Sequence, residues 1–183
     1  MVPLLRVNSA RGRIIGLTAL CIVGCTRCGS NRGARNSNFP PDNPASYVRV
    51  EGPQRLELVS GFARVHVPFA FLSPGETVYL ERCSGSAAWQ LERWTDHQWQ
   101  YAFSPDCYDV ATPAIVITGA TYSDTAVAIL QAHAPDPLKR SLTAGVYRLV
   151  LFAFSHMGDE STLWTLGDTL ALERRASSPF EIQ

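Results

Sequence analysis

Apolar and polar side chains alternate with a period of two through much of residues 47–183, and this alternation most constrains the fold. In 145–154, for example, Tyr147, Leu149 and Leu151 share one face of an extended chain. Such alternation, bounded by turn residues, is typical of half-buried β-strands. The expected strands are 47–50, 55–59, 62–71, 77–82, 88–93, 99–103, 114–118, 125–131, 145–154, 168–174 and 179–183.

Helical periodicity is weak in this part of the chain. The best helical candidate is 128–133, and Pro135 and Pro137 would stop a helix soon after it. Many short strands at roughly 8–12-residue spacing favour a sandwich or a barrel. We therefore expect an all-β domain of antiparallel strands.

The N-terminus has the layout of a secretory signal. Arg6, Arg11 and Arg13 precede the apolar stretch 14–24, and no acidic residue occurs before Asp42. This stretch is much shorter than the about 20 residues that a membrane-spanning helix needs. Residues 1–24 are thus predicted to be a signal peptide.

The end of this segment, Ile22-Val23-Gly24-Cys25, resembles the lipobox of bacterial lipoproteins. The resemblance implies that Cys25 becomes the mature N-terminus, carries the lipid and holds the protein on a bilayer. Thr26 follows Cys25, and in enteric-type sorting an Asp there would favour the inner membrane. We expect a lipid-anchored protein of the bacterial cell envelope, sorted to the outer membrane.

Between the predicted lipid anchor and the domain, residues 26–46 are rich in Asn, Arg, Gly, Ser and Pro. Such a stretch buries too little apolar surface to order itself. The expected organisation is a signal peptide (1–24), a lipidated Cys with a flexible linker (25–46) and one β domain (47–183).

Charge argues against a nucleic-acid binder. The chain has 16 basic and 16 acidic residues, and three basic ones lie in the predicted signal peptide, which leaves 13 against 16 and a net charge of −3. The longest basic runs in the mature part are the pairs Lys139-Arg140 and Arg174-Arg175. A nucleic-acid-binding domain should show a clustered basic face instead.

The five cysteines divide by position. Cys21 lies in the predicted signal peptide, and Cys25 with Cys28 also fits the C-x-x-C spacing of redox motifs, although the context is a linker. Cys83 and Cys107 lie in the domain and could pair in an oxidising compartment. Cys28 would then have no disulfide partner. Such a bridge would stabilise the domain by roughly 3–3.5 kcal/mol.

Three stretches resemble the immunoglobulin-like domains of bacterial secreted and surface proteins. They are a late strand at 144–150, a closing strand at 174–182, and the hairpin formed by Leu91-Glu92-Arg93 and Gln98-Trp99. The resemblance spans 47–183 and implies an immunoglobulin-like sandwich with adhesion, binding or spacing roles, protease inhibition in some relatives, and no catalytic residues. Cys83 and Cys107 are too close in sequence for the inter-sheet disulfide of antibody domains, so their bridge would brace the hairpin region.

Catalytic and metal motifs are weak. The histidines are His66, His97, His133 and His156, and no G-x-S-x-G, H-E-x-x-H or EF-hand pattern occurs. The cluster at 156–160 is the one local group of metal-binding residue types, and it fits a solvated loop better. We expect no enzyme, no cofactor and no metal.

Aromatic side chains crowd around one hairpin, and they are Trp89, Trp94, Trp99, Tyr101, Phe103 and Tyr108. They could pack in the core or form a binding face. The alternation favours the core for Trp99, Tyr101 and Phe103, whereas Trp94 has the opposite parity to Trp89 and is expected to be the most exposed. Trp94 and the hairpin tip, Asp96 and His97, are therefore the candidate binding residues.

The sequence thus favours an envelope lipoprotein with a non-enzymatic binding or structural role, acting on an unknown envelope protein or glycan. One alternative is a carbohydrate-binding module, which two coplanar exposed rings would favour. Another is a protease-inhibitor-like domain that presents a loop at 95–98 or 134–142.

Overall fold

The computed structural model describes residues 39–73, 75–107, 114–131, 142–157 and 167–183 of the 183-residue chain. They belong to one compact unit, Arg35–Gln183. The predicted signal peptide and Cys25 lie outside the described residues, as do Cys28, Tyr108 and His133 and most of the candidate loop 134–142. None of the described segments is a helix long and apolar enough to cross a membrane.

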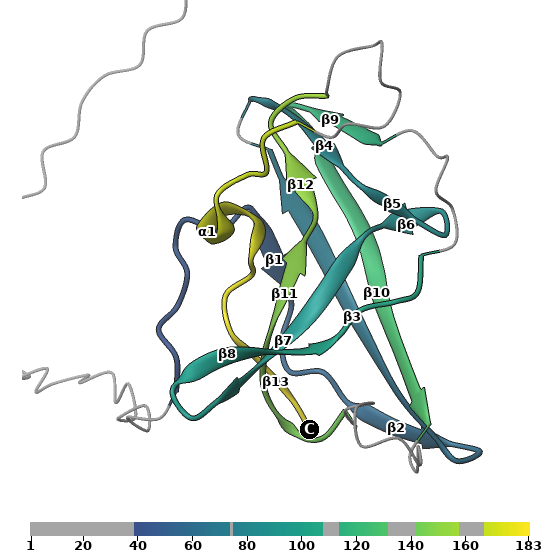
Figure 1. The fold of residues 1–183 in the computed structure, drawn as a ribbon. Coiled ribbons are helices and arrows are strands. Elements are labelled where there is room, and N and C mark those ends of the chain that lie inside the picture. Colours follow the sequence, from purple (N-terminus) through teal and green to yellow (C-terminus); the bar gives the residue numbers. More distant parts are fainter. Residues whose placement is uncertain (1–38, 74, 108–113, 132–141, 158–166) are drawn as a thin grey trace, which may run out of the picture. The chain divides into compact units, whose positions relative to one another are not determined.

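The domain is built from antiparallel sheets that do not close into a barrel, so the all-β expectation is confirmed (Figure 1). The first sheet is centred on β3, which pairs with β10 along its whole length. The strands β1 and β2 share the other edge of β3. The bounds are β1 (Val48–Val50), β2 (Leu56–Val59), β3 (Phe62–Leu72) and β10 (Thr121–Gln131).

The second sheet has the order β13-β11-β7-β8. Its strands are β7 (Trp89–Thr95), β8 (Gln98–Phe103), β11 (Gly145–Leu151) and β13 (Phe180–Ile182). It meets the first sheet at one edge, where Gln54 forms a parallel bridge with Ile182. Two backbone hydrogen bonds of 2.8 Å join Gln54 to Glu181 and Gln183.

A third sheet continues the second one. Its order is β12-β4-β9, and a short hairpin, β5-β6, lies at the junction. Their bounds are β4 (Thr77–Leu80), β5 (Arg82–Cys83), β6 (Ser86–Ala87), β9 (Ile115–Thr118) and β12 (Ala153–Phe154). The predicted strand 145–154 is thus real, and it pairs first with β7 and then with β4. At the switch, the Phe152 backbone bonds to Glu81 and Ala88.

The core lies between the first sheet and the combined second and third sheets. Alternate residues of the central strands fill it, including Val65, Val67 and Phe71 from β3 and Leu149 and Leu151 from β11, all of them fully buried. Each such side chain contributes roughly 1.5–3 kcal/mol when it leaves water. The same alternation that predicted the strands therefore also selects the core.

Two local expectations need correction. The helical candidate 128–133 is wrong over the residues that the structure describes there, because β10 runs to Gln131 and buries Ala126 and Ala128 against the core. The predicted strand 168–174 is also wrong, because Thr169 forms only an isolated bridge with Phe154 and α1 (Leu172–Arg175) forms a single helical turn.

The turn α1 has a packing role. It contacts β11, and the neighbouring Ala176 bridges to Val150. Val150 is fully buried although its side chain lies on the opposite face of β11 from the core. The Asn43 side chain joins the N-terminal segment to α1 by donating to the carbonyls of Glu173 and Ala176, both at 2.8 Å.

Candidate functional site

The outer face of the β7–β8–β11 sheet carries a connected group of polar and aromatic side chains. Register places Glu92 opposite both Arg148 and Tyr101, and Trp94 opposite Trp99. Cross-strand partners point to the same side of a sheet. Because Trp89 and Leu91 define the core side of β7, these five residues lie on the outer side, which we call the β7–β8 face.

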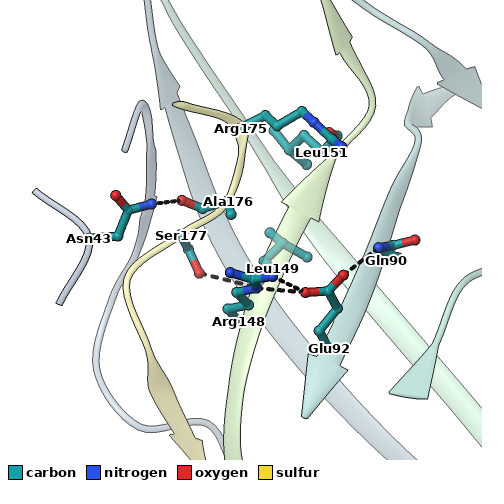
Figure 2. A network of polar contacts seen from close by, with 9 residues as sticks. All are labelled: Asn43, Gln90, Glu92, Arg148, Leu149, Leu151, Arg175, Ala176 and Ser177. Carbon is teal, nitrogen blue, oxygen red and sulfur yellow. Dashed lines mark hydrogen bonds and ion pairs between the residues drawn. The ribbon is translucent and has the colours of Figure 1, made fainter. Parts of the chain in front are cut away.

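An ion pair holds the centre of the β7–β8 face (Figure 2). Arg148 donates from Nε and Nη2 to Oε2 of Glu92, at 2.6 and 2.5 Å. Gln90 donates from Nε2 to the other carboxylate oxygen at 2.8 Å. The side chains of Arg148 and Glu92 are only 16% and 14% exposed, so solvent screens this pair less than an open surface pair.

The aromatic rings pack against this ion pair. The guanidinium of Arg148 lies over the Trp99 ring, 4.6 Å from its centroid, in a cation–π contact. Trp99 in turn packs edge-on against Trp94, with ring centroids 5.1 Å apart and an interplanar angle of 61°. The β7–β8 face is therefore a fixed arrangement in which each group restrains its neighbour.

Tyr101 forms the exposed rim of the same face. Its side chain is 50% exposed, and its hydroxyl shares a 2.9 Å hydrogen bond with Ser104. Trp94 is half-buried and packs against Trp99. The prediction that Trp94 is the most exposed aromatic of this hairpin is therefore wrong, because Tyr101 is more exposed.

The expectation that Trp99 and Tyr101 alternate into the core is also wrong. The register of β8 shifts between Leu91 and Glu92, because Tyr101 pairs with Glu92 while Phe103 pairs with Leu91. This β-bulge inserts one extra residue and changes which residues face inward. Phe103 packs on the core and lies 5.6 Å from Trp89, whereas Trp99 and Tyr101 lie on the outer face.

The hairpin tip is a tight two-residue turn. Asp96 and His97 have φ values of 51° and 61°, between the paired residues Thr95 and Gln98. Two consecutive left-handed residues match the type I′ turn that suits the twist of a hairpin, and Asp tolerates this conformation. Both side chains are exposed at the end of the β7–β8 hairpin.

The disulfide that the sequence suggested is present. Cys83 is bonded to Cys107, and their Cα atoms are 4.8 Å apart. The bridge ties β5 to the segment that follows β8. It therefore braces the base of the hairpin that carries the β7–β8 face, as expected.

The histidines and carboxylates considered as catalytic or metal-binding residues do not gather at one site in the described part of the chain. Among the described residues, no group of three His, Cys, Asp or Glu side chains is placed to hold a metal ion. His66 is exposed on β3, and His156 shares a 3.2 Å hydrogen bond with Ser155.

An open depression of about 380 Å³ lies beside Asp124, with Glu51 and Phe69 among its lining residues. Asp124 is already engaged there, because it accepts hydrogen bonds from the Tyr122 hydroxyl at 2.6 Å and the Thr125 amide at 2.7 Å. Burial, together with this bond, raises the pKa of Tyr122 to about 12. We assign the Tyr122–Asp124 pair a structural role.

Sequence reasoning missed the two ion-pair partners, Glu92 and Arg148, as site residues. A signal for Arg148 exists, because it is the one charged residue in the apolar strand 145–154 and has the parity opposite to Tyr147 and Leu149. The identity of its partner depends on the pairing of β11 with β7, which no local pattern specifies.

Comparison with known protein families, with characterised proteins and with solved structures finds no match for this chain. Its function is therefore inferred from the geometry of the molecule.

Proposed function

We propose that this protein is a lipid-anchored binding protein of the bacterial cell envelope, without enzymatic activity, and that its β7–β8 face receives the partner. The observation that carries the proposal is the ordered group of Arg148, Glu92 and Trp99 on a solvent-facing side of the sheet. Trp, Tyr and Arg are the residue types that dominate binding energy at protein interfaces. A fixed arrangement also loses little conformational entropy when a partner binds.

A protein partner fits this face better than a flat sugar ring. Trp94 and Trp99 are inclined at 61° and so do not form a coplanar platform. One face of Trp99 is already covered by Arg148. A carbohydrate-binding role remains the alternative, with Tyr101 as its most accessible ring.

The protease-inhibitor alternative has less support at 95–98, the one of its two candidate loops that the structure describes in full. Residues 95–98 form the tight turn of a hairpin, whereas an inhibitor needs a longer protruding loop.

We further propose that the domain is a variant of the immunoglobulin-like sandwich. The order β13-β11-β7-β8 corresponds to the G-F-C-C′ order of that fold, and β3 between β1 and β10 corresponds to its B strand. Tyr147, near the start of β11, donates its hydroxyl to the Thr143 carbonyl at 2.7 Å, as in the tyrosine corner of such domains. An experimental structure with a different strand order would contradict this assignment.

The binding role is tested by placing a photo-crosslinking amino acid at Tyr101 of the full chain in expressing cells. Val116, on β9, is the matched control because its side chain is 59% exposed and lies in the third sheet. We expect a protein adduct from position 101 that is absent from position 116 and is lost when Arg148→Ala is added. Equal labelling at both positions, or none, would contradict the proposal. Retention on immobilised envelope glycans through Trp99, without a protein adduct, would favour the carbohydrate alternative.

The anchor is tested separately by incorporation of radiolabelled palmitate. Cys25→Ser should abolish the label, and globomycin, which blocks lipoprotein signal cleavage, should cause the precursor to accumulate. Cys28→Ser is the control and should keep the label. A label independent of Cys25 would contradict lipidation at that residue.

A further inference from the structure

The strand β10 is an edge strand whose C-terminal part, residues 125–131, carries none of the usual protection against pairing. Within the described part of the chain it pairs with β3 on one side and with no strand on the other. Its segment 125–131 reads Thr-Ala-Val-Ala-Ile-Leu-Gln and contains neither a charge nor a proline. Native edge strands are normally blunted by charges, prolines or bulges, because an open edge is a template for another strand.

The hydrogen-bonding direction along β10 follows from that of β3. The amide of Leu72 donates to Tyr47 at 2.8 Å, so the even-numbered residues of β3 turn their backbone groups toward β1. The odd-numbered residues of β3 therefore face β10 and bond to even-numbered residues there, such as Ala126 opposite Val67. The odd-numbered residues of β10 must turn their amides and carbonyls toward the open edge.

An independent contact supports this direction. The amide of Thr125, an odd-numbered residue, donates to Oδ1 of the Asp124 side chain at 2.7 Å. Asp124 thus closes one end of the open edge. Beyond it, Val127 and Ile129 present their backbone groups outward, and their side chains are 37% and 44% exposed on the outer side of the sheet.

We propose that β10 pairs antiparallel with β10 of a second copy of this chain, about a two-fold axis at Ala128. This register sets Val127 against Ile129 of the other copy, Ala126 against Leu130 and Thr125 against Gln131. Apolar residues then lie opposite apolar residues, polar residues lie opposite polar residues, and no two like charges lie opposite each other. In this register both Val127 and Ile129 find backbone partners, whereas the amide of Thr125 keeps its Asp124 acceptor and only the Thr125 carbonyl is open to Gln131 of the other copy.

Engineered disulfides test this register in the full chain. In it, Val127 and Ile129 of opposite copies form a hydrogen-bonded pair with Cα atoms about 5.5 Å apart. That separation lies within the usual disulfide range of about 4.4–6.8 Å. We therefore expect coexpression of differently tagged Val127→Cys and Ile129→Cys chains to give a mixed covalent dimer on non-reducing gels.

Each single variant and the parent chain are the controls, and the parent reports cross-links through the native cysteines. A neighbouring register, centred on Val127 or on Ile129, would instead cross-link the Val127→Cys or the Ile129→Cys chain with itself. Cross-linking of that kind alone, or no cross-link above the parent in any combination, would overturn the proposal.

The sedimentation coefficient of the detergent-solubilised full chain gives a test without new cysteines. Ile129→Lys places a charge on the edge without removing a core side chain, and should convert dimer to monomer. Val116→Lys is the matched control on β9 and should leave the dimer. A parent chain that sediments as a monomer would also overturn the proposal.

Discussion

Ser177→Ala should destabilise the domain far more than the loss of one small hydroxyl suggests. Ser177 is 1% exposed and lies beside β11 where the C-terminal segment bends away from regular pairing. Its Oγ accepts a hydrogen bond from the amide of Leu149 at 3.0 Å and donates one to the carbonyl of Ser178 at 2.8 Å. The side chain thus replaces a backbone acceptor that the bend removes.

The magnitude follows from burial. Alanine would leave the Leu149 amide in the core without an acceptor, and an unsatisfied buried donor costs about 1–3 kcal/mol. For a domain of this size, each kcal/mol lowers Tm by about 2–4 °C. We therefore expect the Tm of Ser177→Ala to fall by about 2–12 °C.

Urea unfolding of the parent and two variants measures this effect. The matched control is Ser155→Ala, because Ser155 is exposed and its hydroxyl donates to the backbone carbonyl of Asp168 at the surface, at 3.2 Å. The control should change the free energy of unfolding by less than about 0.5 kcal/mol. If Ser177→Ala falls within that same range with an unchanged m-value, the Leu149 amide does not depend on Ser177 and the reasoning is refuted.

Three further predictions concern the disulfide, the ion pair and alkaline pH. Replacing both Cys83 and Cys107 with Ser should lower the free energy of unfolding in urea by about 3 kcal/mol relative to the disulfide-bonded parent, and the parent treated with reductant should match the variant. Glu92→Gln should cost about 1.5–3 kcal/mol, since it removes a charged hydrogen-bond acceptor, and a loss below 0.5 kcal/mol would contradict a structural role. Because folding raises the pKa of Tyr122 from 10.0 to about 12, its contribution to stability is complete below pH 10 and is lost as pH rises toward 12. The Tm of Tyr122→Phe should therefore fall less than that of the parent between pH 9 and 11.5, and parallel curves would contradict this.

Much of the strand pattern could be predicted from the sequence because each strand has one buried face. The alternation in 62–71 corresponds to β3, whose Val65, Val67, Phe69 and Phe71 are all buried. The same alternation distinguishes the core side of β11, which carries Tyr147, Leu149 and Leu151, from its outer side. Where burial is regular, the period of two carries the information directly.

The errors arise where pairing between distant segments overrides the local pattern. The parity of Trp99 and Tyr101 depends on a bulge whose position is set by the pairing of β8 with β7. The turn α1 packs against β11 beside the buried Val150, and this contact cannot be seen in residues 168–174 themselves. The ion pair between Glu92 and Arg148 joins residues 56 positions apart and likewise follows from pairing alone.

The two proposed surfaces lie on different sheets, and this has a consequence for binding. The β7–β8 face belongs to the second sheet, whereas the edge of β10 belongs to the first. Pairing through β10 would therefore leave both copies of the β7–β8 face open, so that one dimer could bind two partner sites. On a membrane surface, two linked sites bind more tightly than one, because the second binding event becomes intramolecular. If both proposals hold, Ile129→Lys should weaken retention of the partner at the envelope while leaving the affinity of a single β7–β8 face unchanged, whereas Arg148→Ala should weaken both.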